Sequence, residues 1–293
     1  MKRILVTGGN KGIGLAICQA ILETHDDTHV VLGSRSPERG ASAIASLVEL
    51  QPSWSERLTL LPLDVSDDQS VSSAAATLAA SCSDSVTPLY GIVNNAGIGF
   101  GSNEPGPVLE VNVRGIHRVC QAFIPLLDQK HGRVVNITSA AGPRFVSECQ
   151  PELRQFLVDP KVGWDQLDAF MAEHIDAQTG ELTGHGLSND NTYGFSKACA
   201  NTYTLNLARE HPQLSVNACT PGWIDTDLTH FYAVSSGRSP EELGMKPPSE
   251  GTRAPLHLLF ATLEGNGRYY GSDAVRSPID AYRAPGDPPY TGP

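Results

Sequence analysis

The sequence predicts an α/β fold in which a doubly wound parallel sheet forms a single domain. Short apolar runs rich in β-branched residues alternate with longer helical patterns, and few hairpin signals separate them. The runs are continuously apolar, as is typical of strands that helices cover on both faces. Together these two observations predict successive βαβ units.

The composition narrows the class of protein. Of the 293 residues, 40% are hydrophobic and 18% are charged, which excludes a disordered chain and a collagen-like chain. No apolar run approaches the roughly 20 residues that a membrane helix needs. The net charge of −11 argues against nucleic acid and anionic membranes as partners. Six scattered cysteines and nine histidines show no metal-ligand spacing, so we expect reduced thiols, no metal site and a cytoplasmic protein.

The alternation of strands and helices is regular in the first half of the chain. The expected strands are Arg3–Thr7, His29–Gly33, Leu58–Leu63, Leu89–Asn94 and Gly132–Ser139. The expected helices between them are Gly12–Thr24, Pro37–Leu50, Asp67–Cys82 and a segment around Pro107–Asp128.

The alternation breaks after Ser139. Residues 140–192 are polar and irregular, and they predict a helical insertion with two short helices near 152–158 and 164–176. The pattern then resumes with a helix around Thr192–Glu210, a strand Ser215–Cys219, a helix near Glu250–Leu263 and a strand near Arg268–Gly271. We therefore place one domain at residues 1–275, and we expect the proline-rich residues 276–293 to form a loose C-terminal tail.

A glycine-rich turn joins the first strand to the first helix. Gly8 permits a sharp turn, Gly12 lets the backbone approach a pyrophosphate, and Gly14 lets the helix pack closely on the strand. The N-terminus of the helix would direct free N–H groups and a positive dipole at the phosphates. A glycine-rich string can also be an ordinary turn, but the strand before it and the helix after it favour nucleotide binding.

The end of the second strand indicates which nucleotide is bound. Folds specific for NAD carry an acidic residue here for the ribose hydroxyl, and residues 33–36 contain none. Arg35 and Lys11 instead offer two cations that suit a 2′-phosphate. Both could also be solvated surface cations, but the pattern favours NADP over NAD.

Candidate catalytic side chains gather at the expected ends of strands. Tyr193 and Lys197 are four residues apart in a predicted helix and therefore share a face. An ammonium beside a phenol lowers the pKa of the phenol and makes it a usable acid or base. Ser139 ends one strand and Asn94–Gly97 follow another, where open α/β sheets place their sites.

With these motifs in this order, the sequence resembles the short-chain dehydrogenase/reductases over about residues 3–275. The resemblance implies a Rossmann-type fold. The matching motifs are Thr7–Gly14, Leu63-Asp64-Val65, Asn94-Asn95-Ala96-Gly97, Asn112, the set Ser139, Tyr193 and Lys197, and Pro221-Gly222-Trp223-Ile224-Asp225-Thr226.

The family resemblance also implies the site residues and the cofactor, NADPH/NADP. Ser139 would hold the substrate carbonyl oxygen, Tyr193 would donate a proton to it, Lys197 would lower the pKa of Tyr193 and bind the nicotinamide ribose, and Asn112 would help to order a water. The implied cofactor-binding residues are Gly8, Asn10, Lys11, Gly12, Ile13, Gly14, Arg35, Asp64, Val65, Asn94, Asn95, Ala96, Gly97, Tyr193, Lys197, Pro221, Gly222, Trp223, Ile224 and Thr226.

Within the family, the sequence is most similar to the monomeric NADPH-dependent carbonyl reductases. These relatives share the loop Asn10–Gly14, the Pro221-Gly222-Trp223 motif and a long insertion before the tyrosine, which here lies 54 positions after Ser139. Their insertion covers the surface that other members use to form tetramers, so the resemblance implies a monomer. It also implies reduction of aldehydes, ketones or quinones.

Two other functions stay open. The same residues could serve an NADP-dependent dehydrogenase of a specific secondary alcohol of terpenoid or steroid type, or a non-catalytic dinucleotide sensor. Cys219 could be a reactive thiol beside the site or a buried inert one. Aromatic residues that could line an apolar substrate pocket are Phe100, Phe145, Trp223, Phe231 and Tyr232.

Overall fold

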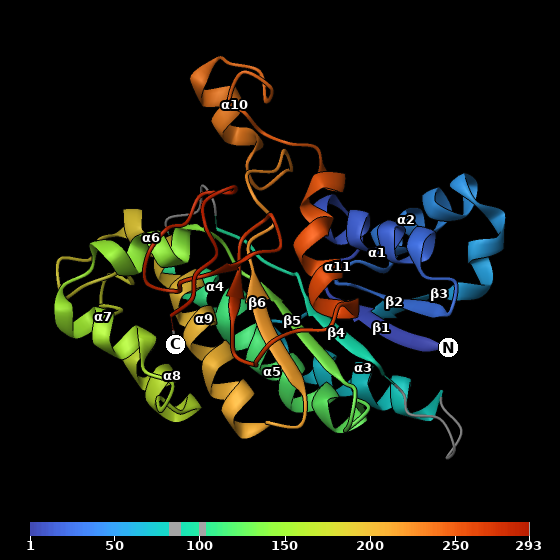
Figure 1. Cartoon of the computed structure of the whole chain (residues 1–293), viewed down its shortest axis with the longest axis horizontal. Coiled ribbons are helices and arrows are strands. Elements are labelled where there is room, and N and C mark those ends of the chain that lie inside the picture. Colours follow the sequence, from blue (N-terminus) through green and yellow to red (C-terminus); the bar gives the residue numbers. More distant parts are fainter. Residues whose placement is uncertain (82–88, 100–103, 293) are drawn as a thin grey trace.

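One eight-stranded sheet runs through the computed structural model, which describes residues 1–81, 89–99 and 104–292 (Figure 1). The strand order is β3-β2-β1-β4-β5-β6-β7-β8, and every pair is parallel except β7 with β8. The strands are β1 (Lys2–Val6), β2 (Thr28–Ser34), β3 (Leu58–Pro62), β4 (Gly91–Asn94), β5 (Arg133–Ile137), β6 (Ser215–Cys219), β7 (Tyr269–Tyr270) and β8 (Arg276–Ser277). The order reverses between β1 and β4, so the predicted doubly wound Rossmann-type fold is confirmed.

Helices cover both faces of the sheet (Figure 1). One face carries α1 (Gly12–Thr24), α2 (Pro37–Leu50) and α11 (Arg253–Phe260). The opposite face carries α3 (Asp68–Ala80), α5 (Gly115–Phe123) and α9 (Thr192–Glu210). Short 3-10 helices connect these elements at Pro52–Arg57, Asn189–Asn191 and Pro248–Thr252.

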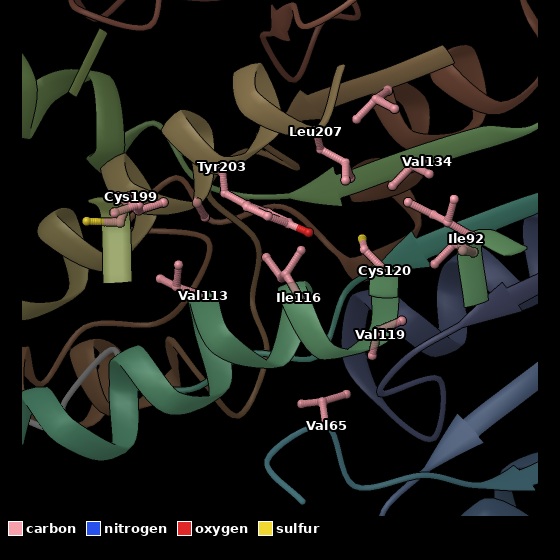
Figure 2. Packing of buried hydrophobic residues seen from close by; sticks show 14 of the residues in the cluster. Val65, Ile92, Val113, Ile116, Val119, Cys120, Val134, Cys199, Tyr203 and Leu207 are labelled. Carbon is pink, nitrogen blue, oxygen red and sulfur yellow. The ribbon is translucent and has the colours of Figure 1, made fainter. Parts of the chain in front are cut away.

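The two faces hold two separate hydrophobic cores because side chains alternate along each strand. On β1, Ile4 and Val6 pack with the helices of one face, whereas Leu5 packs with those of the other. Figure 2 shows the second core, where Tyr203 and Leu207 of α9 lie opposite α5. Apolar residues on both sides of every central strand explain why the runs in the sequence are continuous.

The predicted helix around Pro107–Asp128 consists of four consecutive helical segments of different type. They are α4 (Pro105–Leu109), a π-helical turn (Glu110–Arg114), α5 and a 3-10 turn (Ile124–Leu126). Pro125 lacks the N–H that would continue α5, which explains the last break. The π-helical turn has no signature in the hydrophobic pattern.

The insertion contains one more helix than the sequence predicts. The two expected helices are α7 (Pro151–Val158) and α8 (Trp164–Glu173), and α6 (Ala141–Glu148) precedes them. Gly142 and Pro143 obscure α6 in the sequence, although a proline is tolerated in the first turn of a helix. All three helices pack against α9, on the side that faces away from the sheet (Figure 1).

Two parts of the chain after β6 differ from the sequence prediction. The helix α10 (His230–Ser236) projects from the body of the molecule (Figure 1). The expected loose tail is wrong, because β8 pairs with β7 and the backbone N–H of Tyr290 donates to the carbonyl of Arg276 at 3.1 Å. This proline-rich segment has no regular structure after β8, and hydrogen bonds from side chains to the backbone hold it instead.

Cys82 and Phe100 lie outside the described residues. Within the described parts of the chain, no helix has the length and apolar character needed to cross a membrane.

Candidate active site

The glycine-rich turn has the geometry of an anion-binding loop. Gly8 and Gly12 have φ of +63° and +54°, which favour glycine. A Cβ at Gly14 would lie 2.3 Å from the carbonyl oxygen of Gly8, so only glycine fits there. The helix α1 has neither a side-chain cap nor an acidic residue in its first turn, which leaves its N–H groups free to bind phosphate. These residues therefore fit a dinucleotide pyrophosphate.

Hydrogen bonds tie this turn to the end of β4. Asn95 donates from Nδ2 to the carbonyl of Thr7 at 2.9 Å, and the Thr7 hydroxyl accepts from the backbone N–H groups of Asn95 and Ala96 at 3.0 Å. Sequence reasoning did not give Thr7 this role, although it lies in the matched motif. The side chain of Asn94 turns the other way and donates to Asn136 Oδ1 at 2.8 Å inside the core. Any contact of Asn94 with a cofactor would therefore come from its backbone.

The two predicted cations both face carboxylates from distant parts of the chain. Lys11 Nζ lies 2.6 Å from Asp227 Oδ2, and Arg35 Nε lies 4.0 Å from Asp64 Oδ2. The hydrogen bond from Lys11 lowers the pKa of Asp227, and Arg39 acts on Asp227 in the same direction. Sequence reasoning missed Arg39 and Asp227, which lie near Lys11 only in the folded chain.

Ser139 and Tyr193 lie side by side at the end of β5. The Ser139 hydroxyl accepts from the backbone N–H of Ala141 at 3.2 Å at the start of α6. Burial raises the pKa of Tyr193 to about 12, although its hydrogen bond with Ser139 opposes this shift. The phenol of Tyr193 is therefore protonated at neutral pH, and it lies beside a hydroxyl that can share a bound oxygen atom.

Lys197 is buried below Tyr193, with 5% of the residue exposed. Its ammonium lies 5.5 Å from the centre of the Tyr193 ring and donates to the carbonyl of Ile137 at 3.2 Å. Burial lowers the pKa of Lys197 to about 8. The sequence predicts that this ammonium lowers the pKa of Tyr193, but in this structure burial of the phenol dominates and the pKa rises.

Asn112 belongs to the π-helical turn and is fully buried. Its side chain accepts from the N–H of Ile98 and donates to the Ile98 carbonyl, both at 2.9 Å, and it also donates to Ser196 Oγ at 3.1 Å. Ser196 in turn donates to the carbonyl of Tyr193 at 2.8 Å. Asn112 is thereby joined to the helix that carries Tyr193 and Lys197. Sequence reasoning missed Ser196, and its position directly before Lys197 is the only signal that the sequence offers.

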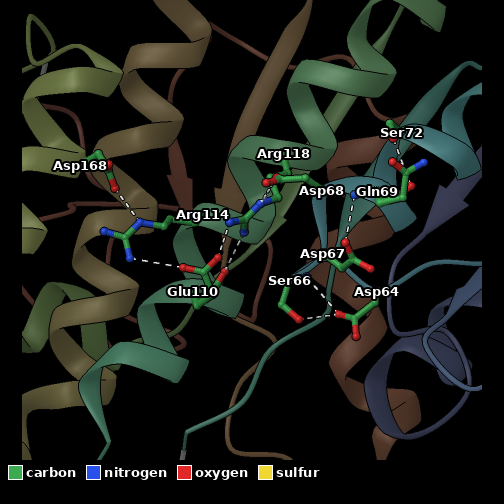
Figure 3. A network of polar contacts seen from close by, with 10 residues as sticks. All are labelled: Asp64, Ser66, Asp67, Asp68, Gln69, Ser72, Glu110, Arg114, Arg118 and Asp168. Atoms are coloured by element: carbon green, nitrogen blue, oxygen red, sulfur yellow. Dashed lines mark hydrogen bonds and ion pairs between the residues drawn. The ribbon is translucent and has the colours of Figure 1, made fainter. Parts of the chain in front are cut away.

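An ion-pair network holds the π-helical turn between α3 and α8 (Figure 3). Glu110 binds both Arg114 and Arg118, which reach Asp168 of α8 and Asp68 of α3 respectively. The insertion is thus connected to the turn that carries Asn112.

A cleft of about 850 Å³ opens beside these residues. The described residues that line this cleft include Ser139 and Tyr193. They also include three of the predicted aromatic residues, Phe145, Trp223 and Tyr232. Phe231 is 37% exposed and is not among the described lining residues. Pro221, Gly222 and Ile224, which are among the predicted cofactor-binding residues, also line the cleft.

The sequence leaves open whether Cys219 is a reactive thiol beside the site or a buried inert one, and the structure favours the buried one. No part of its surface is exposed, and burial raises the pKa of its thiol. A protonated, inaccessible thiol is inert. Among the described residues, no group of three or more His, Cys, Asp or Glu side chains is arranged to hold a metal.

Comparison with known proteins identifies the family. The model of the short chain dehydrogenase family matches residues 2–149. Carbonyl reductase (NADPH) 1 of Sus scrofa is 31% identical over 283 residues, which cover 90% of this chain and 88% of the relative. The Homo sapiens protein of the same name is 30% identical and covers 90% of this chain and 92% of its own.

Solved structures share the fold at lower identity. Menthone neomenthol reductase from Mentha piperita has a TM-score of 0.71 and 22% identity, covering 92% of this chain and 98% of its own. Salutaridine reductase from Papaver somniferum has a TM-score of 0.71 and 23% identity, covering 92% of this chain and 99% of its own. The family match over half of the chain and the relatives that span most of it show that the chain belongs to the short-chain dehydrogenases.

Proposed function

We propose that this protein is an NADPH-dependent carbonyl reductase that converts aldehydes, ketones or quinones to alcohols. The observation that carries the proposal is the meeting of a hydroxyl, a protonated phenol and a buried ammonium, from Ser139, Tyr193 and Lys197, next to a phosphate-binding turn. The names of the relatives support the same activity, since those at about 30% identity are NADPH carbonyl reductases.

The residues present fit a dinucleotide. The glycine-rich turn and the N-terminus of α1 would bind the pyrophosphate, and Lys11, Arg35 and Arg39 would bind the 2′-phosphate. Trp223 and its neighbours in the motif at residues 221–226 would enclose the nicotinamide end of the cofactor. NADPH, when bound there, supplies a hydride to the carbonyl carbon.

The side chains of the chain supply the proton and the electrostatic stabilisation. Ser139 donates a hydrogen bond to the substrate oxygen, and Tyr193 donates its phenolic proton to the same oxygen as negative charge develops. The positive charge of Lys197 stabilises the phenolate that remains. Asn112 is held by hydrogen bonds with Ile98 and Ser196. It would help to order a water molecule that reprotonates Tyr193 through Lys197.

The names of the relatives favour reduction over the alternative of alcohol oxidation, since those at about 30% identity are NADPH carbonyl reductases. The same residues would serve both directions, with the phenol of Tyr193 as the acid in reduction and its phenolate as the base in oxidation. The sensor alternative needs no proton donor, so it gives no chemical reason for the buried charge of Lys197 beside Tyr193.

Replacing Tyr193 with Phe tests the proposal. The Tyr193→Phe variant removes only the phenolic proton donor, so carbonyl reduction should fall by roughly 100-fold to 10,000-fold. NADPH affinity, measured by fluorescence titration, should change little. Turnover is followed by the absorbance of the reduced nicotinamide with a quinone, an α-dicarbonyl, an aromatic aldehyde and a cyclic terpenoid ketone. Tyr290→Phe is the control. Full activity in Tyr193→Phe would exclude the mechanism.

The pH dependence of reduction should report Lys197. Because burial lowers its pKa to about 8, kcat/KM should fall above about pH 8 as the ammonium loses its proton. Tyr193, with a pKa of about 12, stays protonated in this range. The folded pKa of Lys197 lies below the unfolded value of 10.5, so its own contribution to stability rises with pH between these values. The decline therefore comes from catalysis, and a rate that stays level to pH 10 would contradict the assignment.

Asp227 should weaken the preference for NADPH. Its carboxylate holds Lys11 and would repel a 2′-phosphate, so Asp227→Asn should lower the Kd for NADPH by roughly twofold to fivefold and leave the Kd for NADH unchanged. Asp27→Asn is the matched control, because Asp27 forms a similar surface ion pair with Lys2 at 3.1 Å, away from the turn. An equal change for both cofactors, or a preference of the parent protein for NADH, would contradict the 2′-phosphate site.

The insertion also supports a monomer. In α8, the Trp164 ring stacks on His117 of α5 with ring centres 3.6 Å apart, so the insertion covers this helix. The covered surface is unavailable to a second chain. Light scattering should give a mass near 31.2 kDa, whereas a fourfold larger mass would show a tetramer.

A further inference from the structure

The proline-rich C-terminal segment forms part of the cleft described above. Ala281, Tyr282, Arg283 and Pro285 line the same cleft as Ser139 and Tyr193. The segment leaves the sheet after β8 and then returns to β8. At the point of return, the Arg276 guanidinium lies 5.3 Å from the centre of the Tyr290 ring. The predicted loose tail is thus an ordered wall.

An ion pair between Arg283 and Asp273 holds this wall to the sheet. The two terminal guanidinium nitrogens of Arg283 lie 2.6 Å and 3.1 Å from the carboxylate oxygens of Asp273, and the side chains of Arg283 and Asp273 are 6% and 13% exposed. Burial raises the pKa of Asp273, but the hydrogen bonds from Arg283 and from the backbone of Gly286 and Val275 outweigh it and lower the pKa. The pair is therefore charged and bidentate at neutral pH.

The remaining donors of Arg283 are also occupied. Its Nε donates to the carbonyl of Pro288, and its terminal nitrogens donate to Ser277 Oγ and to the carbonyl of Asp287 as well as to Asp273. All five N–H groups of a guanidinium are accounted for. Arg283 therefore fixes the shape of the segment and leaves no donor for a substrate.

A second ion pair joins the segment to the insertion. Asp280 Oδ2 lies 2.8 Å from a terminal nitrogen of Arg154 in α7. The segment is consequently held from two sides, by the turn between β7 and β8 that carries Asp273 and by the helix that carries Arg154.

Tyr282 lies between these two anchors with its ring available to a ligand. It is 47% exposed although it lines the cleft, and the guanidinium of Arg144 in α6 lies 5.1 Å from the centre of its ring. Tyr269 lines the same cleft as Tyr193 and Tyr282, and both of these residues raise its pKa electrostatically. A half-exposed aromatic ring in a cleft is a surface for apolar or aromatic contact.

We propose that the C-terminal segment Asp280–Pro285 is the outer wall of the substrate cleft and that Tyr282 is a specificity-determining residue for substrates with more than one ring. The inference rests on the proposed carbonyl reductase activity. A carbonyl group held at Ser139 and Tyr193 would direct the far ring of such a substrate toward Tyr282. Arg283 is a positioning residue, because it acts only through the segment that it holds.

The experiment compares a large substrate with a small one in the full-length protein. For Tyr282→Ala, kcat/KM for the bicyclic ortho-quinone 1,2-naphthoquinone should fall roughly tenfold, mainly through a higher KM. The value for butane-2,3-dione, which has no ring, should stay within twofold. Tyr282→Phe should retain the preference of the parent protein. Tyr290→Ala is the matched control, since Tyr290 also lies over an arginine of the same segment but is not among the described lining residues.

A further variant of the full-length protein tests the anchor. Arg283→Ala should shift the ratio of the two substrates in the same direction as Tyr282→Ala. An unchanged ratio in Tyr282→Ala would overturn the inference, as would an equal loss in Tyr290→Ala. Failure of the parent protein to reduce either compound would count against the proposed activity itself, and it would be recognised before any variant is made.

Discussion

Burial of α9 on both sides is the constraint on which the rest of the site depends. The sheet covers one side of this helix, and α6, α7 and α8 of the insertion cover the other. The Lys197 ammonium points from this helix toward the sheet, where it donates to the carbonyl of Ile137 in β5, and burial there lowers its pKa to about 8. Tyr193, one turn earlier, lines the cleft beside residues of α6, and burial raises its pKa to about 12. The sheet therefore encloses the ammonium, whereas the insertion shapes the cleft beside the phenol.

The sequence predicts most of the fold because the relevant signals are local. The helices Gly12–Thr24, Pro37–Leu50 and Thr192–Glu210 and the strand Ser215–Cys219 have the predicted bounds, since each ends where its own apolar pattern ends. The glycine-rich turn is equally local, because a positive φ at Gly8 and Gly12 is required by the turn itself. The π-helical turn at Asn112 is different. It depends on hydrogen bonds to Ile98 and Ser196, which no periodicity in the sequence reveals.

The parts of the site that sequence reasoning did not predict are set by contacts between distant residues and by depth of burial. The sequence offers Lys11 as a cation for a 2′-phosphate, but its carboxylate partner Asp227 is 216 positions away and is not visible as a neighbour in the sequence. The lowered pKa expected for Tyr193 followed from the presence of Lys197 four residues later, which is visible in the sequence. The depth of the phenol in the protein is not visible there, and the desolvation that it causes is the larger effect. Identities and spacings thus indicate the candidate reacting groups but not their pKa values.

The two halves of the cleft differ in how they are built, and this difference follows from what each must do. The reacting groups project from the ends of β5 and from α9, where a packed sheet and helix hold them rigidly. The outer wall has no regular structure and is held instead by charged side chains, Arg283 with Asp273 and Arg154 with Asp280. A change of residue in the wall alters the shape of the cleft without disturbing the strands beneath it, because its backbone is not part of the parallel sheet. If the proposed activity holds, substrate selection can therefore change in this chain while the proposed proton donor and the buried ammonium stay the same.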